Sequence, residues 1–213
     1  MSHNNLIAKD GWPIIGFFAI ITIIFHLLKI SSLTWLFLLI TIFCIYFFRN
    51  PRRVSADEEG IVVAPADGKV KSITKVYEDK FIQDEAICIS IFLSLFNVHI
   101  NRVPISGVVD FTKKQGLSFR PAYKSDVRNT NVSTYTGLET RYGRVLVVQI
   151  TGIIARRIVT WVKKGDIVQT GKHLGLIRFG SCTEVYLPVG AQIMVEIGQS
   201  IRGGETIIAK LND

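Results

Sequence analysis

Apolar residues are distributed very unevenly along this chain. Residues 12–28 and 33–48 carry no Asp, Glu, Lys or Arg, and the Lys-Ile-Ser-Ser segment at 29–32 separates them. Each run is close to the lower limit of the roughly 20 residues that an α-helix needs to cross a bilayer. The pattern therefore predicts two apolar helices joined by a tight turn. Such a hairpin either crosses the membrane twice or dips into one leaflet.

From residue 54 onward the pattern changes to short β-branched runs bounded by Gly, Pro and Asp, which is typical of strands. The polar stretch 119–135 is expected to form a long loop, of a kind that is often functional. Residues 153–159 fit either a strand or a short helix. The chain thus divides into a hairpin with a basic flank, residues 1–53, and a mainly β domain, residues 54–213. Strands are expected at 61–63, 69–73, 86–93, 107–111, 145–150 and 183–187.

An internal repeat is visible within the β domain. Residues 165–171 and 198–204 both read Gly-x-x-[Ile/Val]-x-x-Gly, at an offset of 33 residues, and a short apolar run follows each. Residues 65–68, Pro-Ala-Asp-Gly, form a similar turn signal. Glycines at such spacing mark tight turns between short strands. The arrangement resembles the flattened β-sandwich of lipoyl and biotinyl carrier domains, which present a prosthetic group on a turn.

The charge distribution favours a membrane location. The net charge is +8, and Arg49, Arg52 and Arg53 directly follow the second apolar run, while Lys9 precedes the first. Because basic residues flank the cytoplasmic ends of membrane segments, both ends of a two-span hairpin and the whole β domain are expected in the cytoplasm. The same arginines fit either topology anchors or contacts with anionic lipid. No nucleic-acid motif is present, and the cysteines lack the spacing of a zinc site or disulfide scaffold.

Candidate chemistry lies in the segment Phe179-Gly180-Ser181. A serine hydroxyl in a tight turn can add to the preceding carbonyl and convert the peptide into an ester. Glycine favours this because it leaves the carbonyl accessible and permits unusual backbone angles. Elimination and hydrolysis then leave a pyruvoyl group, whose ketone condenses with an amine and accepts electrons as a carboxylate leaves. A Gly-Ser pair by itself fits an ordinary turn equally well.

Several longer stretches decide between these readings. From about residue 47 to the C-terminus, the chain resembles the short bacterial phosphatidylserine decarboxylase proenzymes. The matches occur in the family's order, and the last one is its self-cleavage motif. They are Phe-Arg-Asn-Pro at 48–51, Ala-Pro-Ala-Asp-Gly-Lys-Val at 64–70, Asn-Val-His-Ile-Asn-Arg at 97–102, Gln-Ile-Thr-Gly-Ile-Ile-Ala-Arg-Arg-Ile at 149–158, and Gly-Leu-Ile-Arg-Phe-Gly-Ser at 175–181.

The resemblance implies an enzyme that converts phosphatidylserine into phosphatidylethanolamine at the bacterial cytoplasmic membrane. Cleavage between Gly180 and Ser181 would give a β chain, 1–180, and an α chain, 181–213, which remain together as a heterodimer; a higher oligomer is left open. Ser181 would become the pyruvoyl group and form a Schiff base with the substrate, without pyridoxal phosphate or metal. Two alternatives are a decarboxylase of another serine-headgroup lipid and a non-catalytic, membrane-tethered carrier-like domain.

The helper residues are Asp67 and His99. By sequence alone Asp67 fits a turn aspartate, but the resemblance places it at a catalytic position, where a carboxylate would orient a histidine. His99 is the candidate base for Ser181, because the other histidines lie in a tail, an apolar run and a polar turn. Longer family members carry two histidines three residues apart, and Arg102 stands at the second position here. His99 therefore serves both steps, or water protonates the product. Cys182 replaces the Arg that short members often have.

Overall fold

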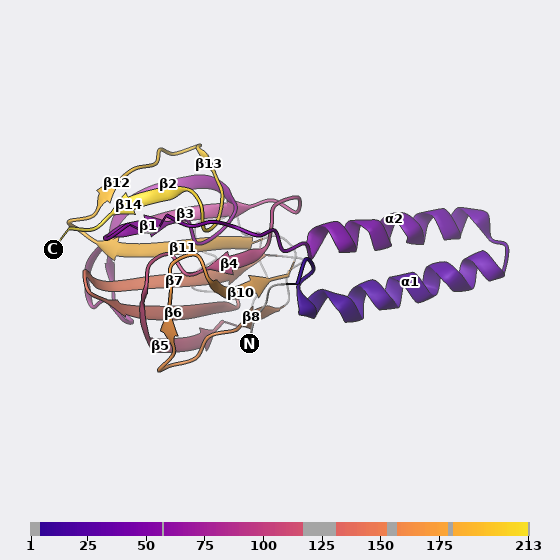
Figure 1. Cartoon of the computed structure of the whole chain (residues 1–213), viewed down its shortest axis with the longest axis horizontal. Coiled ribbons are helices and arrows are strands. Elements are labelled where there is room, and N and C mark those ends of the chain that lie inside the picture. The colour runs from indigo at the N-terminus through magenta and orange to yellow at the C-terminus, as the bar shows by residue number, and fades with distance from the viewer. Residues whose placement is uncertain (1–4, 57, 117–130, 153–156, 179–180, 213) are drawn as a thin grey trace. The chain divides into compact units, whose positions relative to one another are not determined.

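The computed structural model describes residues 5–56, 58–116, 131–152, 157–178 and 181–212 (Figure 1). The chain separates into two compact units, Met1–Arg52 and Arg53–Asp213. The sequence analysis predicted this boundary one residue later, after Arg53. Arg53 belongs with the second unit because its guanidinium pairs with Asp67 and Glu205 there.

The first unit is a helical hairpin. A 3₁₀ turn, Lys9–Gly11, leads into helix α1, Trp12–Leu27, and helix α2 spans Ser31–Phe47. Both helices are apolar on all sides, so large side chains such as Phe17 and Leu39 are exposed. By length and composition alone, Lys9–Leu27 is sufficient to cross a membrane, whereas Ser31–Phe47 is apolar but shorter.

The Phe-Arg-Asn-Pro motif closes the base of this hairpin. Phe48 is fully buried against Gly11, where any side chain would collide with its ring. The backbone N–H of Asn50 donates to the carbonyl of Leu6 at 2.6 Å, and its side-chain amide donates to the carbonyl of Asn5 at 2.9 Å. These residues therefore have a structural function within the hairpin.

The second unit is built from one large sheet and two small ones (Figure 1). The large sheet has eight strands in the order β13-β2-β3-β11-β7-β6-β5-β9. Their bounds are β2 Gly68–Glu78, β3 Asp84–Leu93, β5 Gly107–Gln115, β6 Ser133–Thr140, β7 Gly143–Thr151, β9 Ile167–Val168, β11 Ser181–Pro188 and β13 Ser200–Ile201. The small sheets are β1-β14-β12, with bounds Ile61–Val63, Ile207–Lys210 and Gln192–Ile193, and β4-β10-β8, with bounds Ile100–Arg102, His173–Ile177 and Ile158–Thr160.

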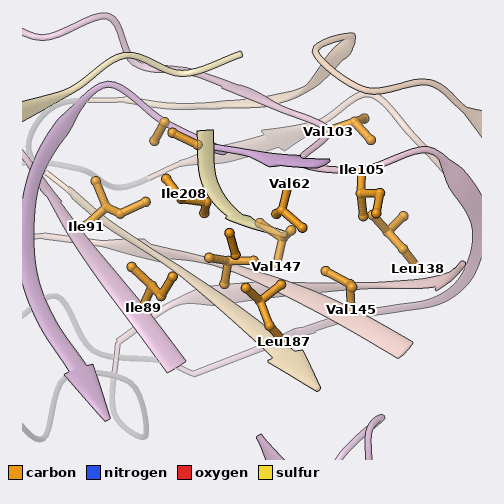
Figure 2. Packing of buried hydrophobic residues seen from close by; sticks show 14 of the residues in the cluster. Val62, Ile89, Ile91, Val103, Ile105, Leu138, Val145, Val147, Leu187 and Ile208 are labelled. Atoms are coloured by element: carbon orange, nitrogen blue, oxygen red, sulfur yellow. The ribbon is translucent and has the colours of Figure 1, made fainter. Parts of the chain in front are cut away.

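The core lies between the large sheet and the β1-β14 pair. Figure 2 shows Val62 and Ile208 of these strands among Ile89, Val147 and Leu187 of the large sheet. The central strands are also buried on their other face by a second apolar cluster, which includes Phe81 of the β2–β3 turn. The prediction of an apolar hairpin followed in sequence by a mainly β domain is thus confirmed. The β domain is a curled eight-stranded sheet packed against smaller sheets.

Strand β6 was not predicted from the sequence. The expected loop at 119–135 was wrong at its end, because β6 begins at Ser133 and pairs with both β5 and β7. The strand lacks an apolar run, yet the hydroxyl residues Ser133, Thr134 and Thr136 are buried. β-branched threonine suits such a strand, but its polarity hid the signal. Residues 117–130 and 153–156 lie outside the described residues, and Ile158–Thr160 is a strand.

The predicted repeat is confirmed in the backbone. Gly165, Gly171, Gly198 and Gly204 all have positive φ angles, of 92°, 76°, 91° and 79°. Such angles suit glycine, which has no Cβ to collide with the backbone. The short strands that follow the first glycine of each repeat, β9 and β13, form the two edges of the eight-stranded sheet.

The structure also shows a partner segment for each repeat, which the sequence reading had not paired. Residues 198–205 are hydrogen-bonded to 64–70, and residues 165–172 are hydrogen-bonded to 103–109. The two partner segments share Pro-x-x-Gly, at 65–68 and 104–107. We call the two assemblies the Asp67 copy and the Ser106 copy, after the residue that precedes the glycine of each Pro-x-x-Gly motif.

Candidate active site

The backbone of Ser181 is fixed at one end of the large sheet. Ser181 is the first residue of β11 and is paired with Leu93 of β3 on one side and with Thr151 of β7 on the other. The carbonyl of Thr151 accepts a 2.7 Å hydrogen bond from the buried side chain of Asn131. Residues 179–180 lie outside the described residues, so the predicted cleavage bond itself is not described.

His99 is held close to the partner strand of Ser181. Its ring is fully buried, and Nδ1 lies 2.9 Å from the carbonyl oxygen of Asn97. Because a carbonyl oxygen only accepts, Nδ1 carries the proton of the neutral ring, and Nε2 is the basic nitrogen. The side-chain oxygen of Asn97 in turn accepts from the N–H and hydroxyl of Ser94, at 2.8 and 2.7 Å. Since Ser94 follows Leu93, one short turn connects the histidine to the strand beside Ser181.

A buried amide network joins strand β4, which begins directly after His99, to β11. Asn101 donates to the hydroxyl of Thr183 at 3.1 Å and accepts from the amide of Gln149 at 2.6 Å. All three side chains are fully buried. Buried polar groups of this kind are costly unless they are paired, so the network favours one register of these strands. The sequence assigned them no role, although amides within otherwise apolar strands were the available signal.

Asp67 lies in a cluster of charges. Its Oδ2 accepts from Nη2 of Arg53 at 2.9 Å, and its Oδ1 accepts from the backbone N–H of Gly203 at 2.7 Å. Nη1 of Arg53 binds Oε2 of Glu205 at 2.7 Å. The sequence expected Asp67 to orient the histidine, but the Nδ1 contact of His99 described above is with a backbone carbonyl. Arg53 and Glu205 were missed because Arg53 looks like one more basic residue after an apolar helix.

An open pocket of about 540 Å³ lies next to this cluster. Lys69 and Cys182 are both paired with Phe92 of β3, so the wall of the pocket is one strand away from the start of β11. Lys69 and Arg202 give the pocket basic groups beside Asp67, which suits an anionic ligand with an amine. The lining residues are Asp67, Gly68, Lys69, Phe92, Ser94, Asn97, Ser200, Ile201 and Arg202.

Cys182 and His173 have structural surroundings. The thiol of Cys182 is buried 3.1 Å from the hydroxyl of Ser90, and burial, with a smaller contribution from Glu184, raises its pKa to about 12. The thiol is therefore neutral near pH 7. The ring of His173 packs edge-on against Trp161. Within the described part of the chain, no group of three His, Cys, Asp or Glu side chains could hold a metal ion.

Comparison with known proteins identifies the family of the chain. The family model for phosphatidylserine decarboxylase matches residues 40–209. The chain is 44% identical to the phosphatidylserine decarboxylase proenzyme of Syntrophotalea carbinolica and 42% identical to that of Carboxydothermus hydrogenoformans, in each case over 99% of both chains. It is 41% identical to the proenzyme of Desulfotalea psychrophila over 96% of both. The chain belongs to the phosphatidylserine decarboxylase proenzyme family.

Proposed function

We propose that this chain cleaves itself between Gly180 and Ser181 and then decarboxylates phosphatidylserine to phosphatidylethanolamine. The observation that carries the proposal is the placement of Ser181. This residue begins β11 between two long strands, beside a turn that holds His99 and one strand away from a basic pocket.

Maturation uses only groups of the chain and water. The Ser181 hydroxyl adds to the carbonyl carbon of Gly180 while Nε2 of His99 takes its proton, and the C–N bond breaks to give an ester with a free amine. Elimination releases the Gly180 carboxylate and leaves a dehydroalanine, and hydrolysis of its imine form consumes water and releases ammonia. The product is a pyruvoyl group at the start of the second chain.

The sheet topology supports a stable pair of chains after cleavage. Within the second chain, β11 lies between β3 and β7, β13 pairs with β2, and β14 pairs with β1. All four partner strands belong to the first chain. Because β11 and β13 pair with first-chain strands in the large sheet and β14 does so in a small sheet, separation of the chains would break hydrogen bonds in two sheets, so we expect a tight heterodimer of 1–180 and 181–213.

A pyruvoyl group fits this position. The first residue of β11 pairs with a strand on each side, and cleavage directly before it would leave a free chain end that carries the ketone. The group supplies a ketone that captures the substrate amine and accepts electrons as carbon dioxide leaves. Lys69 and Arg202 line the pocket, where they would bind the phosphate of the headgroup. His99 would move protons through Nε2, and the carbonyl of Asn97 in the preceding turn holds its ring.

The hairpin is proposed to anchor the enzyme at the bacterial cytoplasmic membrane, with the β domain in the cytoplasm. The apolar helices and the arginines after them support this location. Alkaline carbonate should fail to extract the full chain, and a C-terminal tag should report the cytoplasm. Extraction by carbonate, or a tag that reports the outer side, would contradict the anchor or its orientation.

The experiment that tests maturation is an intact-mass measurement of the purified chain. The wild-type protein should give two species, one ending at Gly180 and one of residues 181–213 with an N-terminal pyruvoyl, and Ser181→Ala should stay full length. The cleaved protein should release carbon dioxide from phosphatidylserine without added pyridoxal phosphate. An active but uncleaved protein would refute the pyruvoyl mechanism. Equal activity on a second serine-headgroup lipid would broaden the substrate class.

A further inference from the structure

An aromatic side chain is exposed at the rim of the pocket. Phe96 is 67% exposed and lies in the short turn between β3 and β4, in which Ser94 and Asn97 line the pocket. Solitary exposed apolar residues are common on protein surfaces. Phe96 differs in its surroundings, because two exposed basic residues, Lys69 and Arg202, line the same pocket. An aromatic side chain next to basic groups is the combination with which interfacial segments bind anionic bilayers.

The turn that carries Phe96 is held by several hydrogen bonds. The backbone N–H of Asn97 donates to the carbonyl of Ser94 at 3.0 Å, and the side-chain oxygen of Asn97 accepts from the backbone N–H and the hydroxyl of Ser94. The carbonyl oxygen of Asn97 also lies 2.9 Å from Nδ1 of His99. One turn therefore exposes Phe96, lines the pocket and holds the candidate base, so a surface that binds Phe96 comes close to the pocket and to His99.

We propose that Phe96 inserts into the lipid surface and holds the mouth of the pocket against it. The inference rests on the proposed function, because a phosphatidylserine headgroup enters the pocket while its acyl chains stay in the bilayer. The hairpin anchor supplies a tether, but a tether by itself does not orient the pocket toward the lipid. Burial of the Phe96 ring in the bilayer strengthens the docked state about tenfold or more. Lys69 and Arg202 attract the anionic headgroups around it.

Tyr77 provides a matched comparison on the same pair of strands. It is 65% exposed, almost as much as Phe96, and it pairs with Glu85 near the first residue of β3, whereas Phe96 follows the last. The two aromatic side chains are therefore separated by roughly the length of a ten-residue strand, about 30 Å. When the mouth of the pocket faces the bilayer, Phe96 contacts lipid and Tyr77 stays in water.

The direct test measures lipid contact at both positions in the whole protein. Phe96→Cys and Tyr77→Cys are each labelled with a small polarity-sensitive fluorophore and placed in vesicles of phosphatidylcholine and phosphatidylglycerol, in which some lipids carry a nitroxide quencher near the headgroup. The three native cysteines are buried, so wild-type protein treated in the same way serves as the blank. Quenching should be strong at position 96 and absent at position 77.

Activity gives a second readout. Phe96→Ser should raise the mole fraction of phosphatidylserine that gives the half-maximal rate in vesicles by up to about tenfold, because the docked state loses the buried ring. The rate on dispersed short-chain phosphatidylserine should stay unchanged, since no bilayer is then involved. Tyr77→Ser should change neither measurement.

Absence of quenching at both positions would overturn the inference. So would a fluorophore at position 96 that is shielded from water but not quenched by the nitroxide lipids, because a second copy or another protein would then cover it. An equal loss of rate on vesicles and on short-chain lipid in Phe96→Ser would also contradict it, since the turn would then act only on the pocket. A chain that does not decarboxylate phosphatidylserine would refute the proposed function, whereas quenching would still test the membrane contact.

Discussion

The Asp67 copy and the Ser106 copy share one backbone design and differ in their chemistry. In both, the first glycine donates to a valine carbonyl, Gly198 to Val70 at 2.8 Å and Gly165 to Val109 at 2.7 Å. In both, the last glycine donates to the partner segment at 2.8 Å, Gly204 to Ala64 and Gly171 to Val103. The two copies occupy opposite edges of the same sheet.

The side chains on this shared frame are different. The backbone N–H of Gly203 donates to the carboxylate of Asp67, and at the equivalent place that of Thr170 donates to the hydroxyl of Ser106. Lys172 stands at the equivalent of Glu205.

The contrast continues along the sheet edge. Lys69 pairs with Ser200 in the Asp67 copy, and the exposed apolar residues Val108 and Ile167 pair at the same place in the Ser106 copy. The shared hydrogen bonds thus build two equivalent turns. A few polar substitutions, with Arg53 supplied from outside the repeat, convert one of them into a candidate active site.

The largest difference between the copies is expected from Asp67→Asn compared with Ser106→Ala. Asp67→Asn removes the charge but keeps an acceptor for Gly203, so it should slow self-cleavage by about 10²–10⁴-fold. Ser106→Ala should leave the rate unchanged, because the equivalent turn lies at the far edge of the sheet. The rate is measured as the disappearance of full-length chain on denaturing gels. Similar rates for both variants would remove the functional distinction between the copies.

The glycines that close the two copies should be equally sensitive, because both have positive φ. A Cβ at Gly204 would lie 2.6 Å from Cδ of Arg102, and one at Gly171 would collide with Ser55. Gly204→Ala and Gly171→Ala should therefore each destabilise the fold by more than the about 1–2 kcal/mol expected for a left-handed residue.

Gly165→Ala is the matched control, since no other atom lies within 4 Å of a Cβ there. Gly165→Ala should destabilise the fold only by the cost of placing a non-glycine residue at a positive φ angle, without a collision. Thermal unfolding of the Ser181→Ala chain in detergent measures all three variants. A melting temperature for Gly165→Ala as low as that for Gly171→Ala would show that the collision does not matter.

A smaller effect is expected at the pocket edge. Lys69→Gln should raise the KM for phosphatidylserine about tenfold, the equivalent of one weakened charge-assisted contact, with little change in kcat. Lys75→Gln serves as the control, because Lys75 lies on the same strand but pairs with Glu85 on the surface. Steady-state assays in mixed micelles separate the two constants. If kcat fell and KM did not, Lys69 would act on the chemical step and not on binding.

The smallest effect is expected from alkylating reagents at Cys182, which lies in the middle of the sheet, between the two copies. A pKa of about 12 means that only about 10⁻⁴ of this thiol is ionised at pH 8, and burial blocks reagents further. Iodoacetamide should therefore leave the folded protein active at pH 8. Labelling should rise only when the pH approaches the pKa or when the chain unfolds. Rapid alkylation of position 182, detected by mass spectrometry, would contradict this placement.

The sequence by itself determined the elements whose signal is local. Two uncharged apolar runs predicted the hairpin, β-branched runs predicted most of the long strands, and repeated glycines predicted turns that the structure confirms by positive φ. The motif at 175–181 identified the family, because that chemistry requires particular residues in contiguous order. The sequence did not predict strand β6, because its residues are buried by the neighbouring strands on both sides and show no apolar pattern of their own.

Only the tertiary structure decided which distant residues meet. Arg53 reaches Asp67 and Glu205 across 14 and 152 residues of sequence, and Asn101 reaches Gln149 and Thr183 across 48 and 82. Such pairings depend on sheet order and register, which are set by the packing of the whole core. A polar side chain in the sequence looks the same whether it faces water or a buried carboxylate. For this reason the sequence indicated a candidate serine and histidine, and the fold supplied the arginine beside the aspartate.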